Sequence, residues 1–224
     1  SIAKEHGLIS VVDNTFATPW ACQPISMGFD VVIHSGTKFL NGHTDLTAGI
    51  VVGRADLIEG VFKTKTRLGG TADAFMCYLL ERGMRTLHVR MPIHASNSSE
   101  LARRMQEHPE ISAVNHPSLE SYADYEVAKR IVPKGTGMLS FVVKGGDERA
   151  MRFVRALDII FEATSLGGIE SLVSCPFNTS DIFVPEEDRL EAGIVPGFVR
   201  MSVGIEDVDD LWSDIEQALS ASQS

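Results

Sequence analysis

The chain has 224 residues, of which 44% are hydrophobic and 22% are charged, and its formal net charge is −10 at pH 7. This composition is typical of a globular protein with a buried core. The negative charge and the lack of a Lys/Arg run argue against a nucleic-acid partner, and no apolar run approaches the roughly 20 residues that span a bilayer.

Short apolar runs alternate with connectors in the first quarter of the chain. Residues 1–7 have the pattern of a helix end that stops at Gly7, and apolar runs follow at residues 8–12, 29–34 and 47–53. Runs of this length are typical of strands that are buried on both faces of a parallel sheet. The pattern predicts an α/β layer. Because the chain begins inside such a layer, we expect an N-terminal portion of the same polypeptide to precede it.

The pattern changes in the second half of the chain. Apolar side chains recur at three-to-four spacing from residue 71 to about 108, which predicts one or two helices, with a kink or break near residue 91 because Pro92 has no amide hydrogen. We predict a domain boundary near residues 88–92. Beyond it, the expected strands are residues 112–115, 138–143, 159–161 and 198–203, and the expected helices are residues 147–157 and 208–219.

Two of the predicted strands end in polar residues of unusual chemistry. Asp13 and Thr15 follow the first strand, and Ser35, Thr37 and Lys38 follow the second. Each group alone is compatible with an ordinary turn. However, ligands of open α/β sheets bind beyond the carboxyl ends of the strands. Together the groups offer an amine, a carboxylate and hydroxyls, which suit the aldehyde, the ring nitrogen and the phosphate of a phosphorylated pyridine aldehyde.

Four motifs resemble those of one enzyme family. The run from His34 to His43 resembles the pyridoxal 5'-phosphate (PLP) lysine signature of the Cys/Met-metabolism, or trans-sulfuration, enzymes, and Asp13 stands upstream as in that family. Residues 165–172 and 200–206 are similar to its two C-terminal motifs. The motifs keep the family's order and extend over nearly the whole chain. This is much more specific than a single short pattern.

The resemblance implies an α/β fold of the PLP-dependent aspartate-aminotransferase-like type (fold type I). Residues 1–90 would be the C-terminal part of the large PLP-binding domain, whose N-terminal part is missing from this chain. Residues 91–224 would form a small C-terminal α/β domain of α+β type. The family builds its sites at subunit interfaces, so the resemblance also implies a homotetramer, a dimer of dimers with shared active sites.

The resemblance further implies a role for each polar residue at the strand ends. Lys38 would hold PLP as a Schiff base and would move protons during catalysis. Asp13 would pair with the pyridinium nitrogen, and Thr15 would lie beside the ring. Ser35 and Thr37 would contact the phosphate. No residue is expected to bind a metal.

Two residues of the C-terminal motifs would bind the substrate. Arg200 would bind the substrate α-carboxylate with a bidentate guanidinium, and Ser165 would lie near this carboxylate and the Lys38 amine. The expected reaction is PLP-dependent γ-elimination at a sulfur amino acid, as in cystathionine γ-lyase. The alternatives are γ-replacement, as in cystathionine γ-synthase, and a methionine γ-lyase. Thr164 stands where many γ-synthases and γ-lyases have Glu, which weakens the choice of cystathionine as substrate.

A prediction of another class is a truncated, non-catalytic module that keeps these motifs only for packing. The presence of Lys38, Asp13, Ser165 and Arg200 together argues against it. The cysteines are three in number and widely spaced, which favours a reducing compartment. With no recognisable targeting segment, the sequence predicts a cytoplasmic protein with a small-molecule substrate and with no nucleic-acid or membrane partner.

Overall fold

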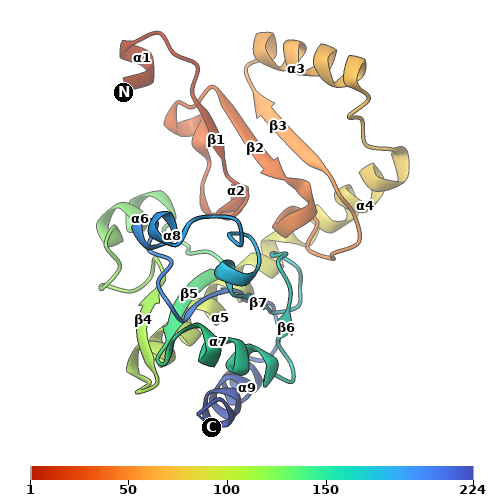
Figure 1. Ribbon diagram of the computed structural model, residues 1–224. Helices are drawn as coiled ribbons and strands as arrows, with labels where there is room; N and C mark the ends of the chain where they lie inside the picture. Colours follow the sequence, from red (N-terminus) through yellow and green to blue (C-terminus); the bar gives the residue numbers. More distant parts are fainter. Residues whose placement is uncertain (1, 224) are drawn as a thin grey trace. The chain divides into compact units, whose positions relative to one another are not determined.

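A computed structural model describes residues 2–223. The chain forms two compact units that divide between Val89 and Arg90; we name them unit 1 and unit 2, and Figure 1 shows their elements. Whether unit 1 is part of a large PLP-binding domain and unit 2 a small C-terminal domain stays a prediction. In residues 2–223, no helix is long and apolar enough to cross a membrane.

Unit 1 contains a three-stranded sheet of order β1-β2-β3. The strands β1 and β2 are parallel, and β3 runs antiparallel to β2. The strands are β1 (Val11–Asp13), β2 (Val31–Ser35) and β3 (Gly49–Gly53). The helical elements are α1 (Ile2–Glu5), α2 (Thr18–Ala21), the 3-10 helix η1 (Pro24–Met27), the π-helical turn η2 (Gly36–Leu40), α3 (Ala55–Leu68) and α4 (Ala74–Met84).

The first apolar run is not the strand that the sequence predicts. Residues 8–12 were expected to be buried on both faces, but β1 begins only at Val11. The side chains of Leu8, Ile9 and Val11 are 59%, 57% and 54% exposed. The physical reason is the position of β1 at the edge of the sheet, where it pairs only with β2 among the described residues. The expected helix stop is confirmed: Gly7 has a φ of 62°, and the Leu8 amide donates to the Ala3 carbonyl at 2.8 Å.

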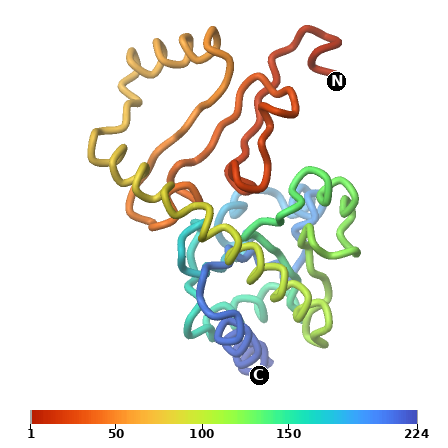
Figure 2. The backbone as a smooth tube through the Cα atoms, turned by 180° about the vertical axis from the view of Figure 1, so that it is seen from behind, coloured from red at the N-terminus to blue at the C-terminus, as the bar shows by residue number. Residues whose placement is uncertain are grey.

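The sequence predicts a kink or break near residue 91, and the structure has no break there. The helix α5 runs from Leu87 to Glu107 with Pro92 inside it, and the tube in Figure 2 follows it as one uninterrupted coil. The interruption comes earlier, because α4 ends at Met84. A proline removes one hydrogen bond from a helix. In α5 the loss is offset by buried side chains that follow on one side of the helix, among them Met91 and Leu101, which are both 0% exposed.

Unit 2 is built on a five-stranded mixed sheet of order β4-β5-β8-β7-β6. The β6–β7 pair is parallel, and the other neighbouring pairs are antiparallel. The strands are β4 (Ile111–Asn115), β5 (Met138–Val143), β6 (Phe161–Glu162), β7 (Leu172–Ser174) and β8 (Phe198–Ser202). After α5, the helical elements are α6 (Tyr125–Ile131), α7 (Gly146–Arg155), the 3-10 helix η3 (Pro176–Asn178), α8 (Glu186–Glu191) and α9 (Val208–Ala221).

One face of this sheet forms the core of unit 2 together with α5, α7 and α9. On the central strand β8 and just after it, Val199, Met201 and Val203 are all 0% exposed. Across the core, the rings of Phe141 and Phe153 pack edge to face with centroids 5.8 Å apart. Because successive side chains of a strand point to opposite faces, the residues between these apolar ones point away from the core. The fold therefore presents two polar residues of β8 on the other face of the sheet.

Candidate functional site

The polar residues at the ends of β1 and β2 lie at the same edge of the unit 1 sheet. The two strands are parallel, and Asp13 stands opposite Ile33 in the register. Ser35 lies two residues beyond Ile33 on β2. Since residues two apart on a strand share a face, Asp13 and Ser35 lie on the same face of the sheet, at its carboxyl edge. The exposed Asp13 carboxylate and the half-buried Ser35 hydroxyl are accessible from that face.

Two hydrogen bonds connect these strand ends through Thr15. The Thr15 amide donates to Asp13 Oδ1 at 2.9 Å, and the Ser35 amide donates to Thr15 Oγ1 at 2.8 Å. Thr15 is buried, and both bonds are partly buried. The two segments are 20 residues apart in sequence. The Thr15 hydroxyl therefore fixes the start of the Lys38 turn relative to Asp13.

Lys38 lies in an irregular turn that directly follows β2. The turn η2 spans Gly36–Leu40, and Lys38 within it has a φ of −90° and a ψ of −137°, outside the helical region. The Asn41 amide donates to the Gly36 carbonyl at 3.1 Å, and the Gly42 amide donates to the Lys38 carbonyl at 2.8 Å. These bonds close the turn around the non-helical residue. They give Lys38 a defined backbone position at the edge of the sheet.

The turn is held from two sides. On one side, the Ala48 amide donates to Thr37 Oγ1 at 3.0 Å, and the Thr37 amide donates to the Ala48 carbonyl at 3.3 Å. On the other side, α4 packs closely against Asn41, because a Cβ at Gly83 would collide with the Asn41 backbone and side chain. Gly83 thus allows the helix to approach the end of the turn. Thr37, one of the predicted phosphate contacts, has a structural bond to Ala48 as well.

The side chain of His34, on β2, points to the opposite face of the sheet from those of Asp13 and Ser35. It is buried, and its Nδ1 has no hydrogen-bond partner among the described residues. Burial lowers the pKa of His34, an effect that the charge of Asp13 and a hydrogen bond to the Asn14 backbone partly offset. A largely apolar hollow of about 350 Å³ lies on this face, and it is lined by His34, Val32, Val52 and residues of α2 and η1. None of the five predicted cofactor residues lines it.

Arg200 and Ser165 both lie in unit 2, and Arg200 bonds the backbone directly before Ser165. Arg200 is on β8, and its Nη2 donates to the carbonyl of Thr164 at 2.7 Å. Ser165 is the next residue along the chain, so the bond places the Ser165 backbone beside the guanidinium. Burial lowers the pKa of Arg200, and the negative charge of Asp181 opposes this shift. An arginine stays protonated in proteins, so the half-buried group is a cation that a carboxylate can neutralise.

Three polar residues to which the sequence analysis assigned no role, Ser171, Ser202 and Glu206, form hydrogen bonds that hold residues 164–171. Ser202 accepts a hydrogen bond from the Gly167 amide at 2.8 Å. Glu206 accepts hydrogen bonds from the Ser171 amide at 2.5 Å and from the Ser171 hydroxyl at 2.9 Å. All three residues lie inside the motifs that carry the family resemblance. The alternation along β8, with polar residues at 200 and 202 between buried apolar ones, is the signal that indicates Ser202.

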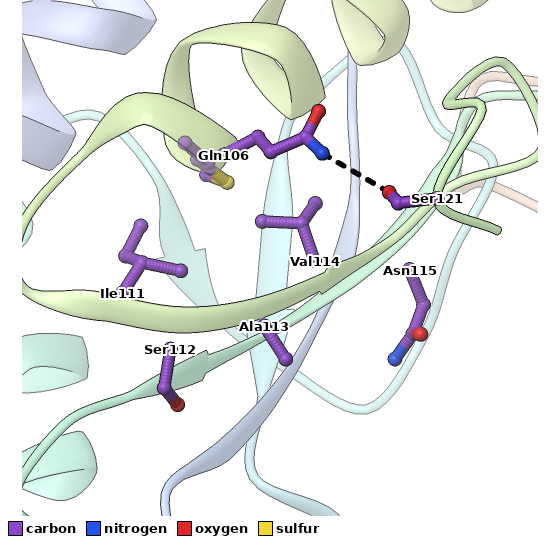
Figure 3. A pocket seen from close by; sticks show the side chains of 8 residues that line it. Gln106, Ile111, Ser112, Ala113, Val114, Asn115 and Ser121 are labelled. Carbon is purple, nitrogen blue, oxygen red and sulfur yellow. Dashed lines mark hydrogen bonds between the residues drawn. The ribbon is translucent and has the colours of Figure 1, made fainter.

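A further hollow of unit 2 holds none of the predicted residues. It has a volume of about 290 Å³ and is lined by the end of α5, by β4 and by Ser121. Figure 3 shows the Gln106 amide reaching the Ser121 hydroxyl across it, a bond of 3.1 Å. Its side chains are small, apolar or neutral, with no titratable group among them. Among residues 2–223 there is also no group of three or more His, Cys, Asp and Glu side chains that is placed to hold a metal ion.

The structure thus brings the predicted residues together in two groups, each within one unit. Asp13, Thr15, Ser35, Thr37 and Lys38 gather at the carboxyl edge of the unit 1 sheet. Arg200 and Ser165 lie along β8 and the segment that β8 holds in unit 2. The first group is compatible with the predicted cofactor site, and the second is compatible with the predicted site for a carboxylate.

Comparisons with known proteins identify the family. Residues 1–220 match the model of the Cys/Met metabolism PLP-dependent enzymes. The chain is 40% identical to an L-methionine gamma-lyase of Pseudomonas putida over 223 residues, which are 99% of this chain and 56% of that enzyme. It is 39% identical to a cystathionine beta-lyase of Lactococcus lactis over 98% of this chain and 58% of that enzyme. The chain belongs to the Cys/Met-metabolism family of PLP-dependent enzymes.

A solved structure confirms the predicted fold class. The crystal structure of cystathionine gamma-lyase from Lactobacillus plantarum, complexed with L-serine, superposes with a TM-score of 0.94 at 33% sequence identity. The superposition covers 99% of this chain and 58% of that one. The chain therefore has the fold of a type I PLP enzyme over the part that the superposition covers. It spans a little more than half the length of the relatives that it matches.

Proposed function

We propose that this chain is part of a PLP-dependent carbon–sulfur lyase that acts on a sulfur amino acid by γ-elimination. The observation that carries the proposal is the Thr15 bridge, which joins the end of β1, with Asp13, to the start of the turn that contains Lys38. A lysine in a solvated loop needs no such anchor. Membership of a PLP-dependent family agrees with this assignment.

The residues at the sheet edge fit PLP by their chemistry. The Asp13 carboxylate is exposed, which suits a partner for a protonated ring nitrogen, and Thr15 is held beside it. The Ser35 and Thr37 hydroxyls flank Gly36, whose missing side chain lets the turn pass close to Ala48. Hydroxyls and main-chain amides of such a turn suit a phosphate. When bound, PLP supplies an electron sink for the negative charge that develops at the α-carbon of the substrate.

The chain's own residues have distinct tasks in this proposal. Lys38 would hold the cofactor through its Nζ, and the same amine would move protons at the α- and β-carbons of the substrate. Asp13 keeps the ring nitrogen protonated. In unit 2, Arg200 binds the α-carboxylate and so orients the α-hydrogen for removal. Ser165 adds a hydrogen bond to the same carboxylate.

The same proposal covers partners and location. The substrate is a small sulfur amino acid, and neither nucleic acid nor a membrane is a partner. The functional protein is a cytoplasmic homotetramer, a dimer of dimers with shared active sites, that includes an N-terminal portion of the same polypeptide. The motifs shared with the family support this part of the proposal.

A substrate panel tests the reaction. The intact protein, loaded with PLP, is given cystathionine, methionine, and an O-acylhomoserine with cysteine. We expect α-ketobutyrate from cystathionine, as in γ-elimination. Release of methanethiol from methionine as the faster reaction would assign a methionine γ-lyase instead, and formation of cystathionine would assign γ-replacement. No product from any of the three substrates would contradict the proposal and would favour a non-catalytic module.

A further inference from the structure

Ser202 shares the polar face of β8 with Arg200. The two residues are separated by one position, and the apolar residues on either side of Ser202, Met201 and Val203, are 0% exposed in the core. Ser202 itself is only 2% exposed. A hydroxyl buried to this extent needs a hydrogen-bond partner. It finds one in the Gly167 amide, 2.8 Å away.

The segment around Ser165 is thereby bound to β8 at two points. Arg200 Nη2 donates to the Thr164 carbonyl at 2.7 Å, and Ser202 Oγ accepts from the Gly167 amide at 2.8 Å. Ser165 lies between these two anchors. Gly167 has a φ of 79°, in the left-handed region that favours glycine. Its amide points to the Ser202 hydroxyl.

The far end of the segment is fixed separately. The Ser171 amide and hydroxyl donate to Glu206, at 2.5 Å and 2.9 Å, and the Gly204 amide donates to the Ser171 hydroxyl at 2.8 Å. The Ile205 amide also donates to the Ile169 carbonyl at 2.9 Å. These bonds hold residues 169–171 firmly. Near Ser165, two side chains bond the backbone: Arg200 and Ser202. Of these two, only Ser202 has no proposed role in binding the substrate.

We propose that Ser202 is a positioning residue for the substrate carboxylate. By accepting the Gly167 amide, it holds the backbone of Ser165 beside the Arg200 guanidinium. The guanidinium has five N–H donors, so its bond to Thr164 leaves others for a carboxylate. The distance between Ser165 and these donors then sets the affinity for the carboxylate. The inference rests on the proposed function, because Ser165 and Arg200 receive their roles there.

The test compares two small amines on the intact, PLP-loaded protein. Glycine carries an amine and a carboxylate, whereas methylamine carries the amine alone. The dissociation constant of each is measured from the change in the visible absorption of the cofactor. The variants are Ser202→Ala, which removes the acceptor, and Ser202→Thr, which keeps it. The matched control is Ser98→Ala, because Ser98 is also a fully buried serine of unit 2, but its hydroxyl donates to the Thr136 carbonyl and not to residues 164–171.

We expect Ser202→Ala to raise the dissociation constant of glycine about five- to tenfold, the usual effect of losing one buried hydrogen bond, and to leave that of methylamine unchanged. Ser202→Thr should restore glycine binding, and Ser98→Ala should leave both constants unchanged. Hydrogen exchange of residues 164–168 gives a readout that needs neither PLP nor turnover. Exchange in this segment should become about fivefold faster in Ser202→Ala and stay unchanged in Ser98→Ala.

Other outcomes overturn the proposal. One such outcome is that Ser202→Ala has the same glycine dissociation constant and the same hydrogen-exchange rates as the wild type. Another is that the affinities for glycine and methylamine fall equally. An Arg200→Lys variant tests the substrate role of Arg200 separately from the positioning role of Ser202. If Arg200→Lys lowers the affinity for glycine and Ser202→Ala does not, only the positioning role fails. If Arg200→Lys leaves the glycine constant unchanged, the substrate role in the proposed function fails, and the role of Ser202 fails with it.

Discussion

The two units support their candidate site residues in different ways. In unit 1 both faces of the small sheet are partly uncovered, with Val11 on one face 54% exposed and Val52 on the other 49% exposed. In unit 2 the central strand β8 has one face in a closed core, where Val199 and Met201 are 0% exposed. Arg200 therefore stands on a packed scaffold. Individual hydrogen bonds to Thr15 and Ala48 hold the Lys38 turn.

The largest expected effect is the sensitivity of unit 2 to acid. His94 and His116 of unit 2 are both 0% exposed, and burial lowers the pKa of each to about 4. The ordinary value is 6.5. Below this value the unfolded chain takes up protons that the folded unit does not, so unit 2 loses stability as the pH falls from 6.5 to about 4. The slope is up to about 1.4 kcal/mol per pH unit for each histidine.

Each unit has its own fluorescent reporter for this prediction. Trp20 lies in unit 1 and Trp212 in unit 2. Urea unfolding of the Trp20→Phe and Trp212→Phe variants at pH 7 and pH 5 therefore follows the units separately. His116→Gln should reduce the pH dependence seen through Trp212 by about one proton. If the Trp212 signal has the same slope with and without His116, the buried histidines do not control the acid stability of unit 2.

A smaller effect is expected from the hydrogen bond that holds the Lys38 turn. Thr37→Val keeps the shape of the side chain but removes the hydroxyl that accepts the Ala48 amide. A bond of this kind contributes about 1 kcal/mol, so the dissociation constant of PLP should rise about tenfold when the lost phosphate contact is included. Thr37→Ser should bind PLP nearly as the wild type does. Equilibrium dialysis against PLP measures both constants.

The neighbouring Thr47 provides the control for this prediction. It is exposed, and Thr47→Val makes the same chemical change next to Ala48. We expect no change in PLP affinity from Thr47→Val. An equal fall of PLP affinity in Thr37→Val and Thr47→Val would mean that the hydrogen bonds of the turn do not determine cofactor affinity.

Much of the fold could be predicted from local patterns. The apolar runs at residues 138–143 and 198–203 correspond to β5 and β8, and the expected helix at residues 208–219 corresponds to α9. The exposure of residues 8–12 could not be predicted, because a run of apolar residues does not tell how many strands lie beside it. Pro92 was misjudged for a similar reason, since the buried side chains of α5 outweigh the loss of one hydrogen bond.

The candidate site was predictable as a set of residues but not as a set of bonds. Lys38 and Asp13 are recognisable because a polar motif follows a strand. The bond from Ser35 to Thr15 spans 20 residues, and the bond from Gly167 to Ser202 spans 35. Such partners are determined by sheet register and by the course of a loop. The alternation of polar and apolar residues indicates Ser202 as a polar-face residue of β8, but only the structure shows that its hydroxyl accepts the Gly167 amide.

The central claim, that Lys38 holds PLP, can be tested directly. The PLP-loaded protein is reduced with borohydride, which fixes the cofactor to the lysine that holds it, and the digested peptides are analysed by mass spectrometry. We predict a single modified peptide that contains Lys38, and no modification in a Lys38→Ala variant. A cofactor fixed to another lysine, or no fixed cofactor in the unmodified protein, would contradict the account.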